Sequence, residues 1–185
     1  MADSSSYCEF TQTLDPFHVH RVYHDTQYGF PLTDDNELFG RLILEINQAG
    51  LSWLTILNKQ ENFRKAYDEF EIEIVANYRE ADYERLRNDA GIIRNRLKIQ
   101  AAIHNAQQII GLQEKYGSFM AWLDANHPLD KAAWVKLFKK TFRFTGGEIT
   151  HEFLMSTGYL PGAHEASCPI FAKIRELSPP WQQKS

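Results

Sequence analysis

Between Pro31 and Pro128 the chain contains no proline, and apolar residues recur at helical spacing through almost all of this stretch. Proline interrupts helices, so a long proline-free run allows several helices to follow one another. A spacing of three or four residues between apolar positions is typical of amphipathic helices that pack against a core. The stretch therefore predicts an all-α domain.

We expect the first helix to begin near Thr33 and to end at Gly50. Further helices are expected over residues 52–67, 80–88, 94–116, 118–125, 130–141 and 148–157. Residues 8–31 show no clear helical period over most of their length and are expected to be irregular. Residues 1–7 are expected to be a frayed terminus, and residues 179–185 a tail.

The size and charge of the chain limit its class. Its 185 residues fit one domain, 1–185, whose hydrophobic core is large enough to be stable without disulfides or a metal. A net charge of −4 argues against a protein that coats nucleic acid or anionic membrane over a large area. Two cysteines do not suggest a secreted disulfide framework, and neither a signal-like leader nor an apolar run of ~18 residues is seen. We expect a soluble, cytoplasmic protein without a membrane partner.

One carboxylate lies within the most apolar segment, residues 38–57. On a helical wheel Glu45 falls about 20° outside the apolar arc, at the edge of the core. Gly50 is suited to a left-handed helix end, and Ser52 to the start of a second helix with Trp53 in its first turn. The segment predicts a helix, a tight corner and a helix. The alternative to a functional Glu45 and Trp53 is a solvated boundary glutamate and a core aromatic.

A second candidate site lies around the basic segment from Lys131 to Arg143, which contains no acidic residue and leads into Gly146-Gly147 and another helix. A helix, a glycine turn and a second helix with basic flanks offer amides and lysines to a phosphate. The alternative is that the lysines simply form a solvated helix face.

Cysteine and histidine residues form a third candidate site. His164 and Cys168 are four positions apart, and Cys8 and His24 form a second pair near the N-terminus. Together they have the composition of a closed, tetrahedral structural zinc site. The alternative is two ordinary buried cysteines and two of seven histidines.

Several motifs together resemble one family, the 3-methyladenine DNA glycosylase I family, over roughly residues 8–168. They are Tyr23-His24-Asp25, Gly29, Leu44-Glu45, Gln48-Ala49-Gly50-Leu51-Ser52-Trp53, Asp89-Ala90-Gly91-Ile92-Ile93-Arg94, Phe142-Arg143-Phe144 and the His164/Cys168 pair. The resemblance implies a fold similar to the helix-hairpin-helix DNA glycosylases, with a zinc ion that joins the N- and C-terminal segments.

The resemblance also implies a role for individual residues. The structural Zn²⁺ would be held by Cys8, His24, His164 and Cys168. The damaged base would be bound by Tyr23, Glu45 and Trp53, with Glu45 as the catalytic residue. DNA would be contacted by Leu51, as a wedge in the duplex, and by a hairpin that contains Lys139, Lys140, Arg143, Gly146 and Gly147.

The activity that the resemblance implies is excision of 3-methyladenine from double-stranded alkylated DNA by a monomer. The base would be flipped out and an abasic site left, without lyase activity, because Glu148 stands where bifunctional relatives carry a lysine nucleophile. Such an enzyme needs a wedge, a pocket and a phosphate anchor. The chief alternative is a zinc-stapled helical DNA-binding module without catalysis. A catalytic zinc hydrolase is disfavoured because protein would fill all four ligand positions.

Overall fold

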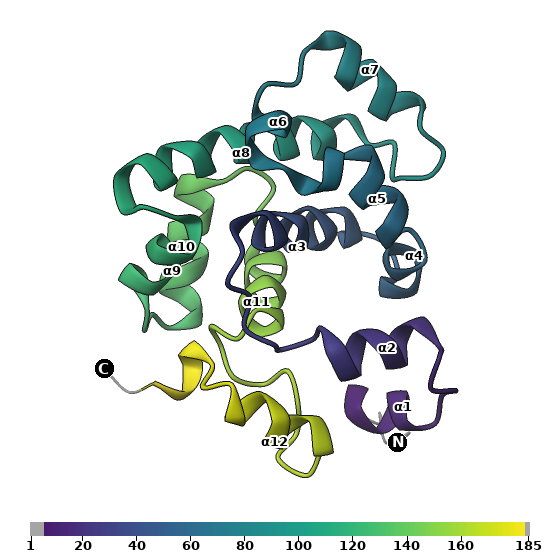
Figure 1. Cartoon of the computed structure of the whole chain (residues 1–185), viewed down its shortest axis with the longest axis vertical. Helices are drawn as coiled ribbons and strands as arrows, with labels where there is room; N and C mark the ends of the chain where they lie inside the picture. Colours follow the sequence, from purple (N-terminus) through teal and green to yellow (C-terminus); the bar gives the residue numbers. More distant parts are fainter. Residues whose placement is uncertain (1–5, 184–185) are drawn as a thin grey trace. The chain divides into compact units, whose positions relative to one another are not determined.

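The computed structural model describes residues 6–183, and Figure 1 shows that this part of the chain is built of helices. No strand occurs among these residues, so the predicted all-α class is confirmed. None of the described helices is long and apolar enough to cross a membrane.

The described elements are α1 (Tyr7–Gln12), α2 (Val19–Thr26), α3 (Asp35–Gln48), α4 (Trp53–Leu57), α5 (Gln60–Ala66), η1 (Asp68–Phe70), α6 (Ile72–Ala76), α7 (Glu80–Asn88), α8 (Arg96–Tyr116), α9 (Phe119–Asn126), α10 (Lys131–Thr141), α11 (Gly147–Ser156), α12 (Pro169–Glu176) and η2 (Pro180–Gln182). Here η denotes a short 3-10 helix.

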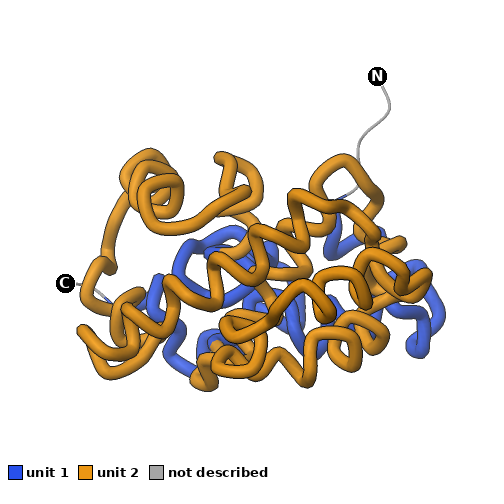
Figure 2. Tube along the Cα trace, turned by 90° about the horizontal axis from the view of Figure 1, so that it is seen from above, with its two compact units in different colours: residues 1–31, 154–185 blue, residues 32–153 orange. Residues whose placement is uncertain are grey.

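The helices are divided between two compact units (Figure 2). Unit 1 combines residues 1–31 with residues 154–185 and so contains α1, α2, the end of α11, α12 and η2. Unit 2 covers residues 32–153, from α3 to the first part of α11. The expectation that residues 1–185 act as a single domain stays a prediction.

Within unit 2, α3 packs against α8, α9, α5 and η1. Its first turn is capped by Asp34, whose side chain accepts from the Glu37 amide at 2.9 Å. Every residue from Leu38 to Asn47 is buried, so other elements cover this part of the helix on all sides and not only on its apolar face. Gly40 permits the closest approach, because a Cβ atom there would lie 2.4 Å from the Phe70 ring. The core therefore extends around α3 beyond the apolar arc that the helical wheel predicts.

Four sequence expectations need correction. Residues 8–31 are not irregular, because they contain α1 and α2. A capping box formed by Ser6 and Glu9 starts α1. The buried faces of the two helices include the polar residues Thr11 and His24, so a search for regularly spaced apolar residues does not detect these helices. The expected tail includes η2, where Trp181 stacks on Phe171 with ring centroids 5.9 Å apart. Residues 1–5 and 184–185 lie outside the described chain, and Tyr7 already belongs to α1.

The fourth correction concerns residues 52–67, which form α4 and α5 rather than one helix. The chain turns at Asn58 and Lys59, and the Lys59 ammonium donates to the carbonyls of Ala90 and Gly91 at 3.0 and 3.2 Å. This long-range contact accompanies a break that local helix propensity does not predict.

Candidate active site and metal centre

The corner between α3 and α4 has the predicted form. Gly50 has a φ of +80°, a conformation that favours glycine. The Leu51 amide donates to the Gln48 carbonyl at 2.7 Å, and the Gln48 side chain donates to the Leu51 carbonyl at 3.0 Å. Ser52 caps α4 by accepting from the Thr55 amide at 3.2 Å. A closed turn therefore holds Leu51 between the two helices.

The side chains around this corner differ in exposure. Glu45 is only 4% exposed, which excludes the alternative of a solvated boundary glutamate. Leu51 is 39% exposed, and Trp53 is partly buried in the first turn of α4. Burying a carboxylate costs free energy unless its partners compensate it, and buried acids of this kind are candidates for functional groups. The corner therefore combines a desolvated acid with an accessible apolar side chain.

Tyr23 lies on α2 in unit 1 and is 3% exposed, whereas Glu45, Leu51 and Trp53 belong to unit 2. The structure thus brings Glu45, Leu51 and Trp53 onto two consecutive helices and the corner between them.

The basic segment forms α10, a turn and the start of α11. Lys139, Lys140 and Arg143 are exposed, and Phe144 adopts a left-handed φ of +61°. A cavity of about 380 Å³ at the turn is lined by Lys139, Phe142, Phe144, Thr145, Gly146 and Ile149. The first amides of a helix have no acceptor within it, so the start of α11 at Gly147 favours an anion.

One acidic side chain opposes that preference. Glu148 lies in the first turn of α11, is exposed, and its carboxylate is 3.5 Å from the Lys131 ammonium. The positive charge available to a phosphate is therefore supplied by the lysines and the arginine more than by the helix end.

Cys8, His24, His164 and Cys168 come together within unit 1 although Cys8 and His164 are 156 positions apart. All four are buried, and their ligand atoms lie within 4.8 Å of one another. Cys8 and Cys168 Sγ lie 3.7 and 3.6 Å from His164 Nδ1, and Cys168 Sγ lies 3.7 Å from His24 Nε2. Tetrahedral zinc bonds of about 2.3 Å to sulfur and about 2.0 Å to nitrogen place the two ligand atoms about 3.5 Å apart. The donor set therefore fits a zinc ion.

The outward nitrogens of both histidines are also fixed. His24 Nδ1 lies 2.6 Å from Asp25 Oδ1, and His164 Nε2 lies 2.7 Å from the Tyr28 carbonyl oxygen. Such outer contacts orient histidines that bind metals. Burial lowers the pKa of His164, which favours the neutral ring that a metal needs, and burial raises the pKa of the Cys8 thiol to about 11. A bound cation would favour the thiolate instead.

Comparison with known families decides the class of the protein. The sequence model of the family described as methyladenine glycosylase matches residues 14–133. The chain belongs to the methyladenine glycosylase family. It is therefore a glycosylase, an enzyme that hydrolyses N-glycosidic bonds, and the family suggested by its motifs is confirmed.

Curated relatives and solved structures resemble this methyladenine glycosylase along most of its length. DNA-3-methyladenine glycosylase 1 of Escherichia coli strain K12 is 36% identical over 83% of this chain and 91% of its own. DNA-3-methyladenine glycosylase of Haemophilus influenzae is 31% identical over 80% and 89%. The structure of 3-methyladenine DNA glycosylase I from Staphylococcus aureus superimposes with a TM-score of 0.78 at 34% identity, over 89% of this chain and 95% of that one.

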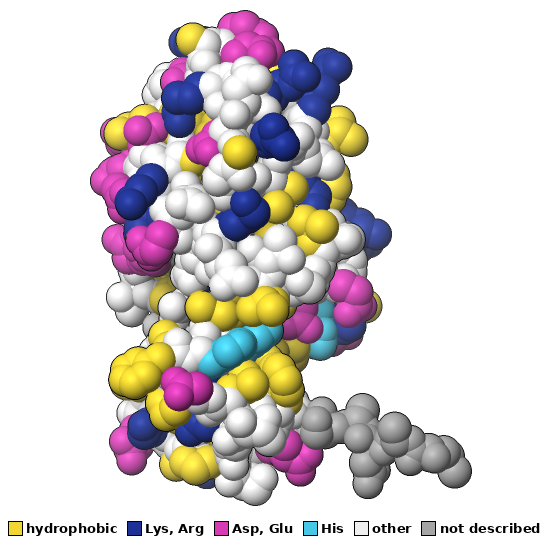
Figure 3. Space-filling view, turned by 90° about the vertical axis from the view of Figure 1, so that its right-hand side faces the viewer, with side chains coloured by type: hydrophobic (Ala, Val, Ile, Leu, Met, Phe, Trp, Pro, Cys, Tyr) yellow, Lys and Arg dark blue, Asp and Glu magenta, His cyan; other side chains and the backbone are white. Residues whose placement is uncertain are grey.

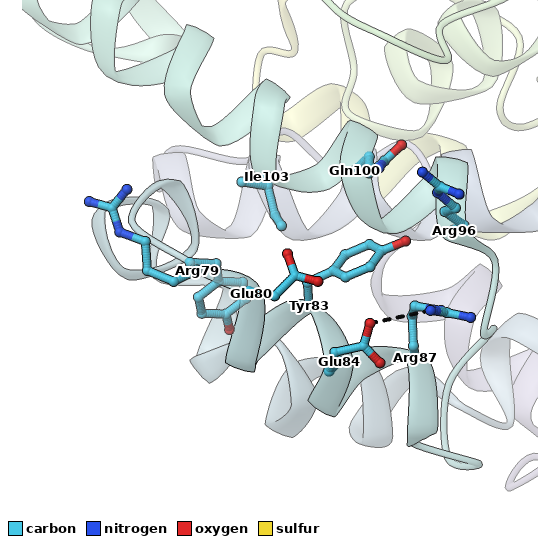
Figure 4. A pocket seen from close by; sticks show the side chains of 9 residues that line it. Arg79, Glu80, Tyr83, Glu84, Arg87, Arg96, Gln100 and Ile103 are labelled. Atoms are coloured by element: carbon cyan, nitrogen blue, oxygen red, sulfur yellow. Dashed lines mark hydrogen bonds and ion pairs between the residues drawn. The ribbon is translucent and has the colours of Figure 1, made fainter.

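This methyladenine glycosylase has another open cavity, of about 440 Å³, between α7 and α8 (Figure 4). Glu84 and Arg87 form an ion pair of 3.2 Å on its wall, and Arg79 points away from it. Three arginines and two glutamates are among its lining residues, so the cavity has only a small excess of positive charge with which to attract a phosphate. None of the sequence-predicted site residues lines it.

Two buried polar residues of the glycosylase, Lys98 and Asn105 on α8, were not predicted from the sequence as candidate site residues. Their side chains contact the backbone at the end of α3 and at the turn after α10. The sequence feature that could have indicated them is their spacing of seven residues, which places both polar side chains on the apolar face of the helix, beside Ile99, Ala102, Ala106 and Ile109.

Proposed function

We propose that the protein is a monofunctional DNA glycosylase that flips 3-methyladenine out of double-stranded alkylated DNA and excises it, leaving an abasic site. The observation that carries the proposal is the buried Glu45 next to the exposed Leu51 corner in a chain of the methyladenine glycosylase family. The names of its relatives support 3-methyladenine as the base.

In this proposal Glu45 selects the base and assists its release. A 3-methylated adenine in DNA is cationic, unlike the normal bases. A carboxylate that is 4% exposed attracts a cation more strongly than one in water, because little solvent screens it. The same charge stabilises the positive charge that the sugar gains as the bond to the base breaks. Methylation has already weakened that bond, so modest catalysis by the protein suffices.

Aromatic side chains would complete the recognition of the base. Trp53 and Tyr23 are proposed to stack on it, because the faces of aromatic rings attract cations. The position of Trp53 in the first turn of α4 supports its part. The part of Tyr23 rests on the resemblance of its motif to the family.

We propose that Leu51 fills the gap left by the flipped base and that the turn after α10 grips the backbone. The apolar character of Leu51 and its 39% exposure support a wedge. Lys139, Lys140 and Arg143 are exposed, which supports phosphate contacts, with the amides of Gly146 and Gly147 beside them. In this proposal α10, the turn and α11 form the helix-hairpin-helix motif. The net charge of −4 and the mixture of charges on the face shown in Figure 3 support a local DNA-binding site over an extensive one.

Zinc is proposed to have a structural role and to bind through Cys8, His24, His164 and Cys168. With four protein ligands no position is left for water, so the metal would take no part in hydrolysis. It would hold the N-terminal helices of unit 1 to the start of α12. The enzyme is proposed to act as a monomer.

A duplex oligonucleotide with one 3-methyladenine tests this function. We expect the purified protein to release the base and to leave an abasic site that breaks only after alkali treatment, because no lyase step is proposed. Binding of the duplex without release would favour the alternative of a zinc-stapled DNA-binding module. Strand breaks without alkali would contradict the monofunctional mechanism.

A further inference from the structure

Two buried polar side chains lie on one face of α8. Lys98 is 4% exposed and Asn105 is 0% exposed. Residues seven apart in a helix share a face and are separated by about 10 Å along the axis. Each contacts the backbone of a different segment in unit 2, so α8 spans the two segments.

Lys98 binds the end of α3. Its ammonium donates to the carbonyl of Asn47 at 2.8 Å and to that of Ala49 at 2.7 Å. Carbonyls at a helix C-terminus lack partners within the helix and favour a cation. Ala49 lies within the turn that the Gln48 carbonyl and the Leu51 amide close, so Lys98 fixes the backbone of that turn.

Asn105 binds the turn after α10. Its side-chain oxygen accepts from the Arg143 amide at 2.8 Å, and its side-chain nitrogen donates to the Arg143 carbonyl at 3.1 Å. The Asn105 side chain thus binds both the backbone amide and the backbone carbonyl of Arg143. The Lys98 ammonium lies 5.9 Å from the centre of the Phe144 ring in the same turn.

We propose that Lys98 and Asn105 are positioning residues that hold the Leu51 corner and the Arg143 turn at a fixed separation along α8, so that both engage one duplex together. This inference rests on the proposed function, in which Leu51 enters the DNA and the turn grips its backbone. Packing alone does not require these side chains. A methionine fills the space of a lysine without burying an ammonium, and burying a charge costs free energy.

A double-mutant cycle tests whether Lys98 acts through Leu51. Lys98→Met keeps the length of the side chain and removes its donors. We expect it to lower kcat/KM for base release from duplex DNA between about tenfold and about a hundredfold, as displaced positioning groups do. In the Leu51→Ala background the same change should cost less than about twofold. Equal losses in both backgrounds would overturn the proposal.

The matched control is Ile109→Val, a change in a buried residue of α8 that contacts neither segment through a polar group. At equal loss of unfolding free energy it should lower duplex activity less than about twofold in both backgrounds. If it matches Lys98→Met, the lysine has only a structural role.

Asn105→Ala should weaken DNA binding and raise KM more than it lowers kcat, because the turn that Asn105 holds is proposed to contact the DNA backbone. A fall in kcat alone would contradict its part.

Hydrogen exchange gives a readout that does not depend on activity. We expect exchange of the Leu51 amide to be at least about tenfold faster in Lys98→Met, and likewise that of the Arg143 amide in Asn105→Ala. Unchanged exchange would overturn the proposal. Lys98→Gln keeps one donor and should be intermediate, which provides the same test if Lys98→Met does not fold. A wild-type protein that releases no base would refute the proposed function, and exchange would still decide whether α8 holds the two segments.

Discussion

Replacing Glu45 with glutamine should slow the release of 3-methyladenine by about two orders of magnitude. The variant keeps the shape of the side chain and removes its charge. Glu45 is 4% exposed, so an effective dielectric constant of about 20 applies better than that of water. Two unit charges about 5 Å apart then attract by about 3 kcal/mol, against about 0.8 kcal/mol in water. A loss of about 3 kcal/mol corresponds to a rate about 150-fold lower.

Single-turnover release from a duplex with one 3-methyladenine measures this change. Affinity for undamaged DNA should stay nearly the same, because glutamine keeps the shape of the side chain and an undamaged duplex carries no cationic base. Glu45→Ala should be slower still, since it also loses the side chain's contacts. If Glu45→Gln keeps its rate within about fourfold, the carboxylate acts as though it were in water, and the proposed role of a desolvated charge is wrong.

Three further changes test the other proposed sites. Cys168→Ala should abolish zinc binding and lower the melting temperature, because structural zinc sites contribute about 10 kcal/mol or more, whereas the exposed neighbour Ser167→Ala should do neither; full stability without zinc would contradict a structural metal. Leu51→Ala should reduce release from duplex DNA more than from single-stranded DNA, and equal losses would argue against a wedge. Replacing Lys139 and Lys140 with glutamine should weaken DNA binding and flatten its salt dependence by about 0.9 in log-log slope per lost contact; an unchanged slope would place the DNA surface elsewhere.

Local signals in the sequence were sufficient to predict the corner and several of the helix starts. Gly50 and Ser52 predict the turn between α3 and α4 because their conformation and capping are local properties. Asp130 and Ser118 cap α10 and α9 where expected. The long helix α8 begins two residues later than predicted, at Arg96, because Asn95 accepts from the amides of two residues in its first turn.

Contacts between distant segments could not be predicted from periodicity. The helical wheel places Glu45 at the edge of the core, yet it is buried because helices surround α3. Two short helices in residues 8–31 were missed because their buried faces include Thr11 and His24. The four cysteine and histidine residues suggest a metal by composition, but only folding brings Cys8 to His164.

The most direct test is chromatography of the bases that the purified wild-type protein releases from methylated duplex DNA. The proposed function predicts free 3-methyladenine in an amount equal to the abasic sites formed, with little release of unmethylated adenine. Duplex DNA that is bound but yields no free 3-methyladenine would contradict excision of this base.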